Sequence, residues 1–292
     1  MDTKRYEILL KVVEVGSLTG AAEMLGCTQS GVSHALSGLE DELGFTLLKR
    51  SRAGVKLTAE GERVLPAVRA LLNAAEQLSQ TAAGLRGLES GTVRIGTFTS
   101  VAVHWLPGII KTFQKNYPGV EFRIMSGDYH DVEQWLEDGS VDLSFVTLPC
   151  GVPCRCIPLA DDRIMAVVPK DHRFADLPRF PLAKAGDEPF ISLLEASDQD
   201  LRRALEAAGV APNIALQTKD DYAIIAMVEN GLGISIMPEL LLKGRTDNVK
   251  VMELAPPASR TIALAVPRGG QPGPATAEFI NCAVSWVRRQ RT

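Results

Sequence analysis

The first residues able to do chemistry are polar side chains that begin at the end of the turn Gly26-Cys27-Thr28. These polar positions are Thr28, Gln29, Ser30, Ser33, His34 and Ser37. Glutamine can form a bidentate contact with adenine, and serine can bond to bases or to phosphates. A cluster of cations follows, made of Lys49, Arg50, Arg52 and Lys56. Such a cluster is expected to contact phosphates, so this region indicates DNA binding although the net charge of the chain is −4.

The second group with possible chemistry is a run of cysteines with the spacing C-x₃-C-x-C. Its members are Cys150, Cys154 and Cys156. Thiolates this close can bind a soft metal ion or form a regulatory disulfide, and Arg155 between them could lower a thiol pKa. Structural zinc normally takes four ligands, and the candidates for a fourth are His172 and Cys282. Buried thiols with no chemical role are the alternative. Cys27 is expected only to pack.

The polar residues need a helix to present them. Three helices are predicted. The first spans residues 4–15 and ends at Gly16, and the second spans residues 21–25 with Ser17 or Thr19 as its cap. The third begins at Gln29. A helix, a short turn with glycine and a second amphipathic helix form a helix-turn-helix. The second helix of that motif enters the major groove with its N-terminal residues against base edges. Glu40, Asp41 and Glu42 would be repelled by phosphate, so they should point away from DNA. A hairpin around residues 52–54 forms the wing.

The stretch GSLTGAAEMLGCTQSGVSHALSGLEDELGFTLLKRSRAGVKLTAEGE resembles the DNA-binding signature of the LysR-type transcription regulators. The resemblance covers about 47 residues without a gap, counted on the stretch as it stands in the sequence. The stretch departs from the family pattern at Cys27-Thr28, Gly31 and Leu48, and Tyr6 departs just before it, but none of these changes removes an expected DNA contact. The resemblance implies a regulator that binds double-stranded promoter DNA. A helical unit used only for protein contact is the alternative.

A long helix is expected over about residues 59–88, with Thr58 as its cap. Its apolar residues alternate between spacings of four and three: Val64, Val68, Leu71, Ala75, Leu78, Ala82 and Leu85. This heptad seam predicts pairing with the same helix of a second subunit, and the resemblance implies an antiparallel pair. Pro66 should kink the helix or delay its start. The alternative is a helix that packs on its own effector domain.

Strands and helices alternate from residue 92 onward, which is typical of a parallel sheet with crossover helices. Strands are predicted at residues 92–97, 120–125, 141–146, 163–168, 190–193, 214–218, 233–236 and 261–266, and helices at 101–115, 131–139, 198–208, 222–230 and 276–289. Two lobes joined by crossing segments would form a clamshell like that of periplasmic binding proteins, as the resemblance also implies. The predicted fold class is therefore α/β, with a mainly α winged helix-turn-helix, a long linker helix and a two-lobed effector domain.

These elements set the predicted domain boundaries. The DNA-binding domain spans residues 1–58, the linker helix and hinge 59–91, and the effector-binding domain 92–292. Within the last domain, lobe I comprises about 92–160 and 266–292, and lobe II about 161–265.

Polar residues at the carboxyl ends of strands are the candidates for effector binding, because ligands of parallel sheets bind at that edge. The candidates are Thr99, Ser100, Asp128, Thr147 and Ser192. The family resemblance implies hydroxyl residues at the positions of Ser100 and Thr147. A carboxylate at Asp128 would oppose an anionic effector. Ordinary helix capping is the alternative role for each hydroxyl.

Several classes of protein are disfavoured by the sequence. The four histidines have no metal-ligand spacing, and no G-x-S-x-G motif or P-loop is present, so an enzyme is not expected. No metal or other cofactor is expected beyond a small-molecule co-inducer. An odd number of cysteines, five, argues against a secreted disulfide scaffold. No apolar run reaches the roughly 18 residues of a membrane span, and the N-terminus does not resemble a secretory signal.

A cytoplasmic regulator therefore fits better than a stand-alone solute receptor. The expected partners are promoter DNA, a small-molecule effector and further copies of the chain as a homodimer or homotetramer. RNA polymerase is a further candidate partner, and no membrane is expected. A thiol-based regulator that senses oxidant or metal through Cys150, Cys154 and Cys156 is the alternative to a metabolite sensor.

Overall fold

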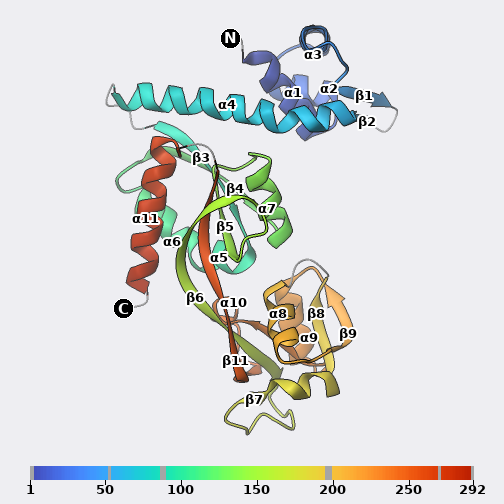
Figure 1. Cartoon of the computed structure of the whole chain (residues 1–292), viewed down its shortest axis with the longest axis vertical. Coiled ribbons are helices and arrows are strands. Elements are labelled where there is room, and N and C mark those ends of the chain that lie inside the picture. Colours follow the sequence, from blue (N-terminus) through green and yellow to red (C-terminus); the bar gives the residue numbers. More distant parts are fainter. Residues whose placement is uncertain (1–2, 52–53, 86–89, 195–198, 269–270, 291–292) are drawn as a thin grey trace. The chain divides into compact units, whose positions relative to one another are not determined.

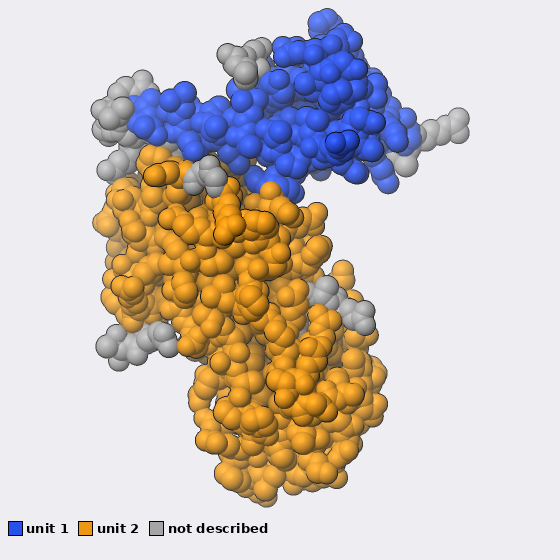
Figure 2. Space-filling model, in the orientation of Figure 1, with its two compact units in different colours: residues 1–88, 138–140 blue, residues 89–137, 141–292 orange. Residues whose placement is uncertain are grey.

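The structure is a computed structural model, and it describes residues 3–51, 54–85, 90–194, 199–268 and 271–290 (Figure 1). The chain forms two compact units (Figure 2). They comprise Met1–Leu88 with Asp138–Ser140, and Glu89–Glu137 with Val141–Thr292. The long helix thus belongs to the same compact unit as the helix-turn-helix.

The first unit begins with three short helices and a hairpin. Its elements are α1 (Lys4–Val15), α2 (Leu18–Leu25), α3 (Gln29–Leu43), β1 (Leu48–Ser51), β2 (Gly54–Leu57) and α4 (Ala59–Leu85). Gly16 ends α1 with a φ of 69°, a left-handed conformation that glycine adopts without steric cost. The Ser17 side chain accepts a hydrogen bond from Gly20 N–H at 3.3 Å, so α2 begins at Leu18, earlier than predicted. The predicted helix-turn-helix is confirmed.

The core of this unit follows the apolar pattern of the three helices. Its most buried members, each at most 1% exposed, are Leu9, Val12, Ala21, Val32, Leu36, Leu39 and, after the helices, Leu47. Val68 of α4 is part of the same core, and Val64 and Leu72 pack against it. Part of the predicted heptad seam is therefore used within the chain, whereas Leu78 is 71% exposed.

The start of α4 is fixed by its cap. Thr58 Oγ1 accepts from Gly61 N–H at 2.9 Å and donates to the Thr46 carbonyl at 2.8 Å. A Cβ at Gly61 would lie 2.3 Å from the Leu47 carbonyl oxygen, so only glycine lets α4 begin this close to the wing. The helix starts at Ala59 and continues past Pro66, so the expectation that Pro66 delays its start is wrong.

The first lobe of the second unit contains the predicted parallel sheet. Its elements are β3 (Ser90–Thr97), α5 (Thr99–His104), α6 (Leu106–Phe113), β4 (Gly119–Ser126), α7 (Tyr129–Glu137), β5 (Leu143–Leu148) and α11 (Pro274–Gln290). Strand β3 pairs in parallel with both β4 and β5. The single helix expected over residues 101–115 is two helices, because Pro107 lacks the N–H that a continuous helix needs and stands in the first turn of α6.

The second lobe contains a smaller sheet and its helices. Its elements are β7 (Phe180–Pro181), the 3₁₀ helix η1 (Leu182–Asp187), β8 (Pro189–Leu193), α8 (Gln199–Ala207), β9 (Asn213–Thr218), α9 (Asp221–Glu229), β10 (Ser235–Pro238) and α10 (Glu239–Leu242). Strands β8 and β9 pair in parallel, and β10 pairs with β6 in antiparallel orientation. The order of β8, α8, β9, α9 and β10 agrees with the sequence prediction, whereas β7, η1 and α10 were not predicted.

Two long strands join the lobes, β6 (Cys154–Pro169) and β11 (Val249–Pro267), and both run through the larger sheet in the order β10-β6-β11-β5-β3-β4. Figure 1 shows them passing from one lobe to the other. They pair with each other in antiparallel orientation, so the predicted parallel pattern does not extend to them, and both are longer than the strands predicted at residues 163–168 and 261–266. The reason is that each strand continues beyond its apolar run into half-buried, polar positions.

The β6–β11 ladder contains two irregularities. In the smaller one, Ile262 pairs with Ala160 and Ala263 with Pro158, so Leu159 of β6 has no partner. The larger one lies in β11. Glu253 pairs with Met165 while Ala258 pairs with the adjacent Ile164, so the intervening part of β11 leaves the ladder. Leu254 and the residue after it pair instead with β7.

Candidate functional site

The N-terminal half of α3 carries the predicted DNA-contacting residues on its exposed side. Thr28, Gln29, Ser30, His34 and Ser37 are all exposed, and Ser33 is half-buried. Thr28 also has a structural role, because its Oγ1 caps α3 by accepting from Gly31 N–H at 3.2 Å. The outward side of this helix is therefore lined with hydrogen-bonding groups.

The cations of the wing lie on the two strands of the hairpin. Lys49 and Arg50 lie on β1 and Lys56 lies on β2, and all three are exposed. Lys49 pairs directly with Lys56, which places two positive charges side by side. Arg50 Nη1 donates to Ser33 Oγ at 3.3 Å and so links the wing to α3. Arg52 lies outside the described residues.

The acidic end of α3 holds the wing in place. Glu40 Oε1 accepts from Leu47 N–H at 2.6 Å and from Leu48 N–H at 3.1 Å, and Glu42 forms an ion pair with Arg5 at 2.7 Å. The sequence predicted only that these carboxylates avoid DNA. Their positioning role could not be read from sequence, since it depends on the fold of the wing.

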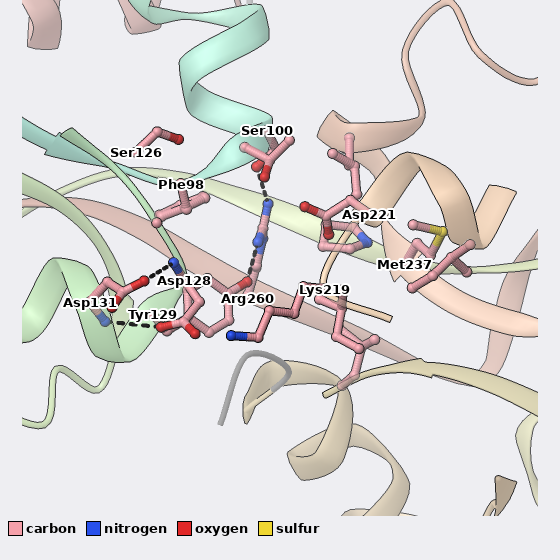
Figure 3. A pocket seen from close by; sticks show the side chains of 17 residues that line it. Phe98, Ser100, Ser126, Asp128, Tyr129, Asp131, Lys219, Asp221, Met237 and Arg260 are labelled. Carbon is pink, nitrogen blue, oxygen red and sulfur yellow. Dashed lines mark hydrogen bonds between the residues drawn. The ribbon is translucent and has the colours of Figure 1, made fainter. Parts of the chain in front are cut away.

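A cavity of about 290 Å³ lies within the second unit, lined by residues of both lobes (Figure 3). The lining residues are Phe98, Thr99, Ser100, Ser126, Gly127, Asp128, Tyr129, Asp131, Leu193, Leu201, Lys219, Asp221, Ile224, Met237, Pro238, Leu241 and Arg260. Apolar walls with a few convergent polar groups are typical of small-molecule sites.

Arg260 is the buried centre of the polar network in this cavity. Its guanidinium contacts Asp162 Oδ2 through Nε at 2.9 Å and Nη2 at 2.7 Å, and the two side chains are 2% and 6% exposed. Nη2 also donates to Ser100 Oγ at 2.8 Å, and Nη1 donates to the Tyr129 hydroxyl. Burial alone would lower the pKa of Arg260, but Tyr129 and Asp162 outweigh it and raise that pKa. The charge of Arg260 is therefore compensated within the protein.

The acidic groups of the cavity differ in their roles. Asp128 accepts from Asp131 N–H at 2.9 Å and Asp131 accepts from Asp128 N–H at 3.0 Å, and these bonds fix the start of α7. Burial raises the pKa of Asp221, which a hydrogen bond from Thr99 partly opposes. Lys219 is exposed and reaches into the cavity from the second lobe (Figure 3).

The five predicted effector residues do not all meet at this cavity. Thr99, Ser100 and Asp128 line it. Thr147 and Ser192 do not line it. Thr147 is buried on β5 opposite Ile262. Ser192 is buried on β8, where its hydroxyl donates to the Leu193 carbonyl.

Sequence reasoning missed most of the lining residues, among them Tyr129, Lys219, Asp221 and Arg260. An arginine directly before the apolar run TIALAV was the one available signal for Arg260.

The three cysteines converge at the start of β6. Their Sγ atoms all lie within 4.8 Å of one another, and those of Cys154 and Cys156 are 3.3 Å apart. Burial raises the pKa of all three thiols, that of Cys150 to about 12. The expectation that Arg155 lowers a thiol pKa is therefore wrong, because successive residues of a strand point to opposite faces and Arg155 is exposed.

The other cysteines and the proposed fourth ligands lie apart from this cluster. Neither His172 nor Cys282 joins it among the described residues. His172 lies 3.6 Å from Glu188, and Cys282 contacts the Ile109 carbonyl at 4.0 Å. Cys27 is exposed, so the expectation that it packs is wrong.

Comparisons with known proteins cover nearly the whole chain. Residues 3–62 match the family model described as bacterial regulatory helix-turn-helix protein, lysR family, and residues 86–288 match the LysR substrate binding domain. An uncharacterized HTH-type transcriptional regulator of Bacillus subtilis, YvbU, is 31% identical over 286 residues, which are 97% of this chain and 98% of that protein.

Solved structures share the fold. Full-length OxyR from Pseudomonas aeruginosa is similar with a TM-score of 0.79 at 23% identity, over 99% of this chain and 95% of that one. Full-length CbnR in complex with its target DNA has a TM-score of 0.67 at 20% identity, over 99% of both chains.

None of the helices in the described part of the chain has the length and apolar character to cross a membrane.

Proposed function

Since the chain belongs to the LysR family of DNA-binding transcription regulators with an effector-binding domain, we propose which of its residues bind DNA and which bind the effector. The helix α3 enters the major groove of promoter DNA, with Gln29, Ser30, Ser33, His34 and Ser37 toward the bases. Lys49, Arg50, Arg52 and Lys56 of the wing contact the phosphates, and Thr28 contacts the backbone at the start of the helix.

The observation that carries this assignment is the link between the wing and α3. The Arg50–Ser33 hydrogen bond holds the cationic hairpin beside the polar face of the helix. Cations fix the register on the duplex and polar groups read the bases, so the two belong to one interface.

The effector site is the cavity around Arg260. Its volume of about 290 Å³ suits a small molecule. Arg260 is already paired with Asp162, and Asp128 and Asp131 cap α7. The exposed Lys219 therefore supplies the charge for an effector, and we assign it a small polar molecule with an acidic group. Thr99 and Ser100 contribute hydrogen bonds, whereas Thr147 and Ser192 would act indirectly through the strands that carry them.

Effector binding would shift the closure of the two lobes and thereby change the affinity for DNA. In this role the protein is a binder rather than a catalyst.

The functional segments are residues 1–58 for DNA binding, 59–91 for pairing of subunits and 92–292 for effector binding. Lobe I comprises 92–160 and 266–292, and lobe II comprises 161–265. The chain acts as a homodimer or homotetramer in the cytoplasm, where promoter DNA and RNA polymerase are its partners.

Thiol-based sensing of oxidant is a weaker second function. Oxidants attack the thiolate, and burial raises the pKa of Cys150, Cys154 and Cys156. Replacing the three by serine distinguishes the functions, because a metabolite sensor keeps its response to effector.

The DNA assignment is tested by mapping the genomic sites bound by the purified full-length chain and measuring affinity against salt concentration. We expect Lys56→Ala to weaken binding to all sequences and to reduce the salt slope by about 1. Gln29→Ala should instead alter the preference among sites, by about 1–3 kcal/mol at the base that it reads.

Lys250→Ala is the matched control, since Lys250 is an exposed lysine of the effector-binding unit. An unchanged salt slope for Lys56→Ala and unchanged site preference for Gln29→Ala would contradict the proposed interface.

A further inference from the structure

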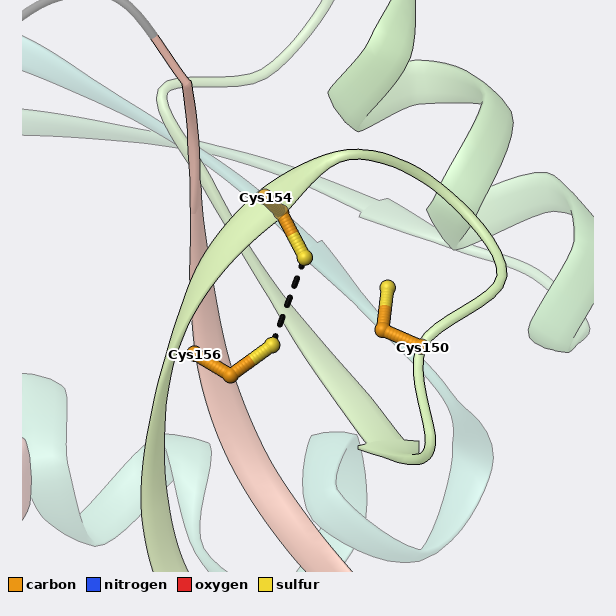
Figure 4. Close-up of side chains that lie close together, drawn as sticks. All are labelled: Cys150, Cys154 and Cys156. Atoms are coloured by element: carbon orange, nitrogen blue, oxygen red, sulfur yellow. Dashed lines mark hydrogen bonds between the residues drawn. The ribbon is translucent and has the colours of Figure 1, made fainter.

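The cysteine cluster at the start of β6 is not used by the proposed DNA and effector sites. Two segments bring it together (Figure 4). Cys154 and Cys156 are alternate residues of β6 and so face the same side, and Cys150 points toward them from the loop after β5. All three thiols are half-buried, which leaves solvent access to the cluster.

The spacing of the sulfur atoms suits a common ligand. Bonds of about 2.3 Å from one metal ion to several thiolates place the sulfur atoms roughly 3.8 Å apart. The three Sγ atoms lie within 4.8 Å of one another, with the closest pair at 3.3 Å, so small side-chain rotations would bring them to that distance.

A disulfide is less compatible with the closest pair. Alternate residues of an extended strand have Cα atoms roughly 6.6 Å apart, at the upper end of the range that disulfides span. The Cys154–Cys156 pair is held in this arrangement by its ladder with β11, where the partners are Pro267 and Ala265.

The loop that carries Cys150 is held by a carboxylate. Glu133 of α7 accepts a hydrogen bond from Gly151 N–H at 2.7 Å. A Cβ at Gly151 would lie 2.7 Å from Glu133 Oε2, so glycine permits this close approach. The rest of the surroundings is apolar, with Val132, Leu136 and Ala265 among the neighbouring buried side chains.

We propose that Cys150, Cys154 and Cys156 form a binding site for one divalent thiophilic cation of the Zn²⁺ and Cd²⁺ class, with the fourth coordination position open to solvent. Soft thiolates select such ions. Three thiolates carry a charge of −3, and Glu133 lies nearby, so a divalent ion leaves less uncompensated charge in this apolar cluster than Cu⁺ would. Glu133 is a positioning residue that acts through the Cys150 loop.

The cysteine site lies next to a contact between the two lobes of the domain. Leu148, just before this loop, accepts a hydrogen bond from Arg203 Nη1 of the second lobe at 3.1 Å. The cysteines thus lie at the start of a strand that connects the lobes and beside a contact between them. An ion at this site would fasten the loop to β6 independently of any effector in the cavity.

The test uses Cd²⁺ as the probe on the full-length, reduced and chelator-treated chain. We expect the ultraviolet charge-transfer absorption of Cd–thiolate bonds to rise to a plateau at one Cd²⁺ ion per chain. Zn²⁺ should compete with Cd²⁺ for the site and so abolish this absorption. Cys150→Ser, Cys154→Ser and Cys156→Ser should each weaken Cd²⁺ binding at least tenfold. Cys27→Ser and Cys282→Ser are the controls and should leave the titration unchanged. Glu133→Ala should weaken binding about tenfold, as loss of an outer partner typically does.

A second measurement does not depend on whether the serine variants fold. Zn²⁺ should protect Cys150, Cys154 and Cys156 of the unaltered chain from alkylation, as read by peptide mass spectrometry, while Cys27 remains reactive. Absence of a plateau, a titration that survives the triple serine substitution, or equal alkylation with and without Zn²⁺ would each overturn the proposal. A plateau unaffected by Cys150→Ser alone would also overturn it, because it would show an adventitious two-thiol site.

Discussion

At the scale of single residues, the buried ion pair between Arg260 and Asp162 shapes the polar network of the cavity and stabilises the effector-binding unit. Breaking a buried pair leaves one charge without compensation and typically costs about 3–5 kcal/mol. We expect Arg260→Met to lower the free energy of unfolding of the effector-binding unit by that amount. Urea denaturation measures it.

Two variants serve as controls for this prediction. Arg163→Met removes an exposed arginine whose ion pairs with Glu239 and Glu253 lie at the surface, so its cost should stay within about 1 kcal/mol. In the double variant Arg260→Met with Asp162→Asn, the amide oxygen can still accept from Leu240 N–H, and much of the stability should return. Equal losses for Arg260→Met and Arg163→Met would refute the role of burial.

Asp221 gives a pH-dependent prediction. Its folded-state pKa is raised above the usual 3.8, chiefly by burial. The folded protein then holds this proton more tightly than the unfolded chain, so the carboxyl destabilises the fold as pH rises from 3.8 through the folded pKa. We expect Asp221→Asn to be stabilising relative to the unaltered chain at pH 7, and this difference to vanish at pH values below 3.8. Denaturation curves across pH check it, and a difference that grows toward acid would contradict it.

The residues predicted from sequence and those missed differ in how local their signal is. Gln29 and Ser33 follow from the amphipathic pattern of one helix. Arg260 was missed because its partner Asp162 lies 98 residues away and the strand that carries it was expected to begin one residue later. Cys150 could be grouped with Cys154 by spacing, but only the fold brings their sulfur atoms together.

At the scale of elements, α4 combines two packing roles. Its first half packs through Val68 on the helix-turn-helix, and Leu78 in its second half stays 71% exposed. An exposed leucine in a heptad seam is expected to pair with another helix. We predict that Leu78→Glu weakens self-association of the full-length chain at least tenfold, as measured by analytical ultracentrifugation.

Ser79→Glu provides the matched control, since Ser79 is the exposed neighbour outside the seam and the change adds the same charge. If both variants associate as tightly as the unaltered chain, α4 does not form the subunit contact.

The elements were predictable to different degrees. Helices α1, α3 and α11 have strong apolar periodicity and were found within a few residues. The crossing strands were seen only in their apolar parts, because the polar half of each strand is stabilised by pairing with a distant segment rather than by burial. The division of one predicted helix into α5 and α6 depends on Pro107, a local signal that periodicity alone did not include.

At the scale of the whole molecule, the proposed function requires that the cavity and DNA binding be coupled. A thermal-shift screen of small polar carboxylates against the full-length chain should identify binders. Lys219→Met should then weaken such a binder at least tenfold, whereas Lys170→Met, at another exposed lysine of the second lobe, should not. The same compound should change the affinity of the unaltered chain for its promoter. Binding that leaves promoter affinity and footprint unchanged would separate the cavity from regulation.

The irregular ladder between the two crossing strands has a mechanical consequence. Strand β6 keeps a β11 partner from Met165 to Ala160 and skips only Leu159, while β11 departs over the longer stretch between Glu253 and Ala258. Of the two connections between the lobes, β11 is therefore expected to be the more compliant. A change in the angle between the lobes would be absorbed mainly as local deformation of β11, while β6 would transmit torsion as far as its bulge at Leu159, just before the end that carries the cysteines.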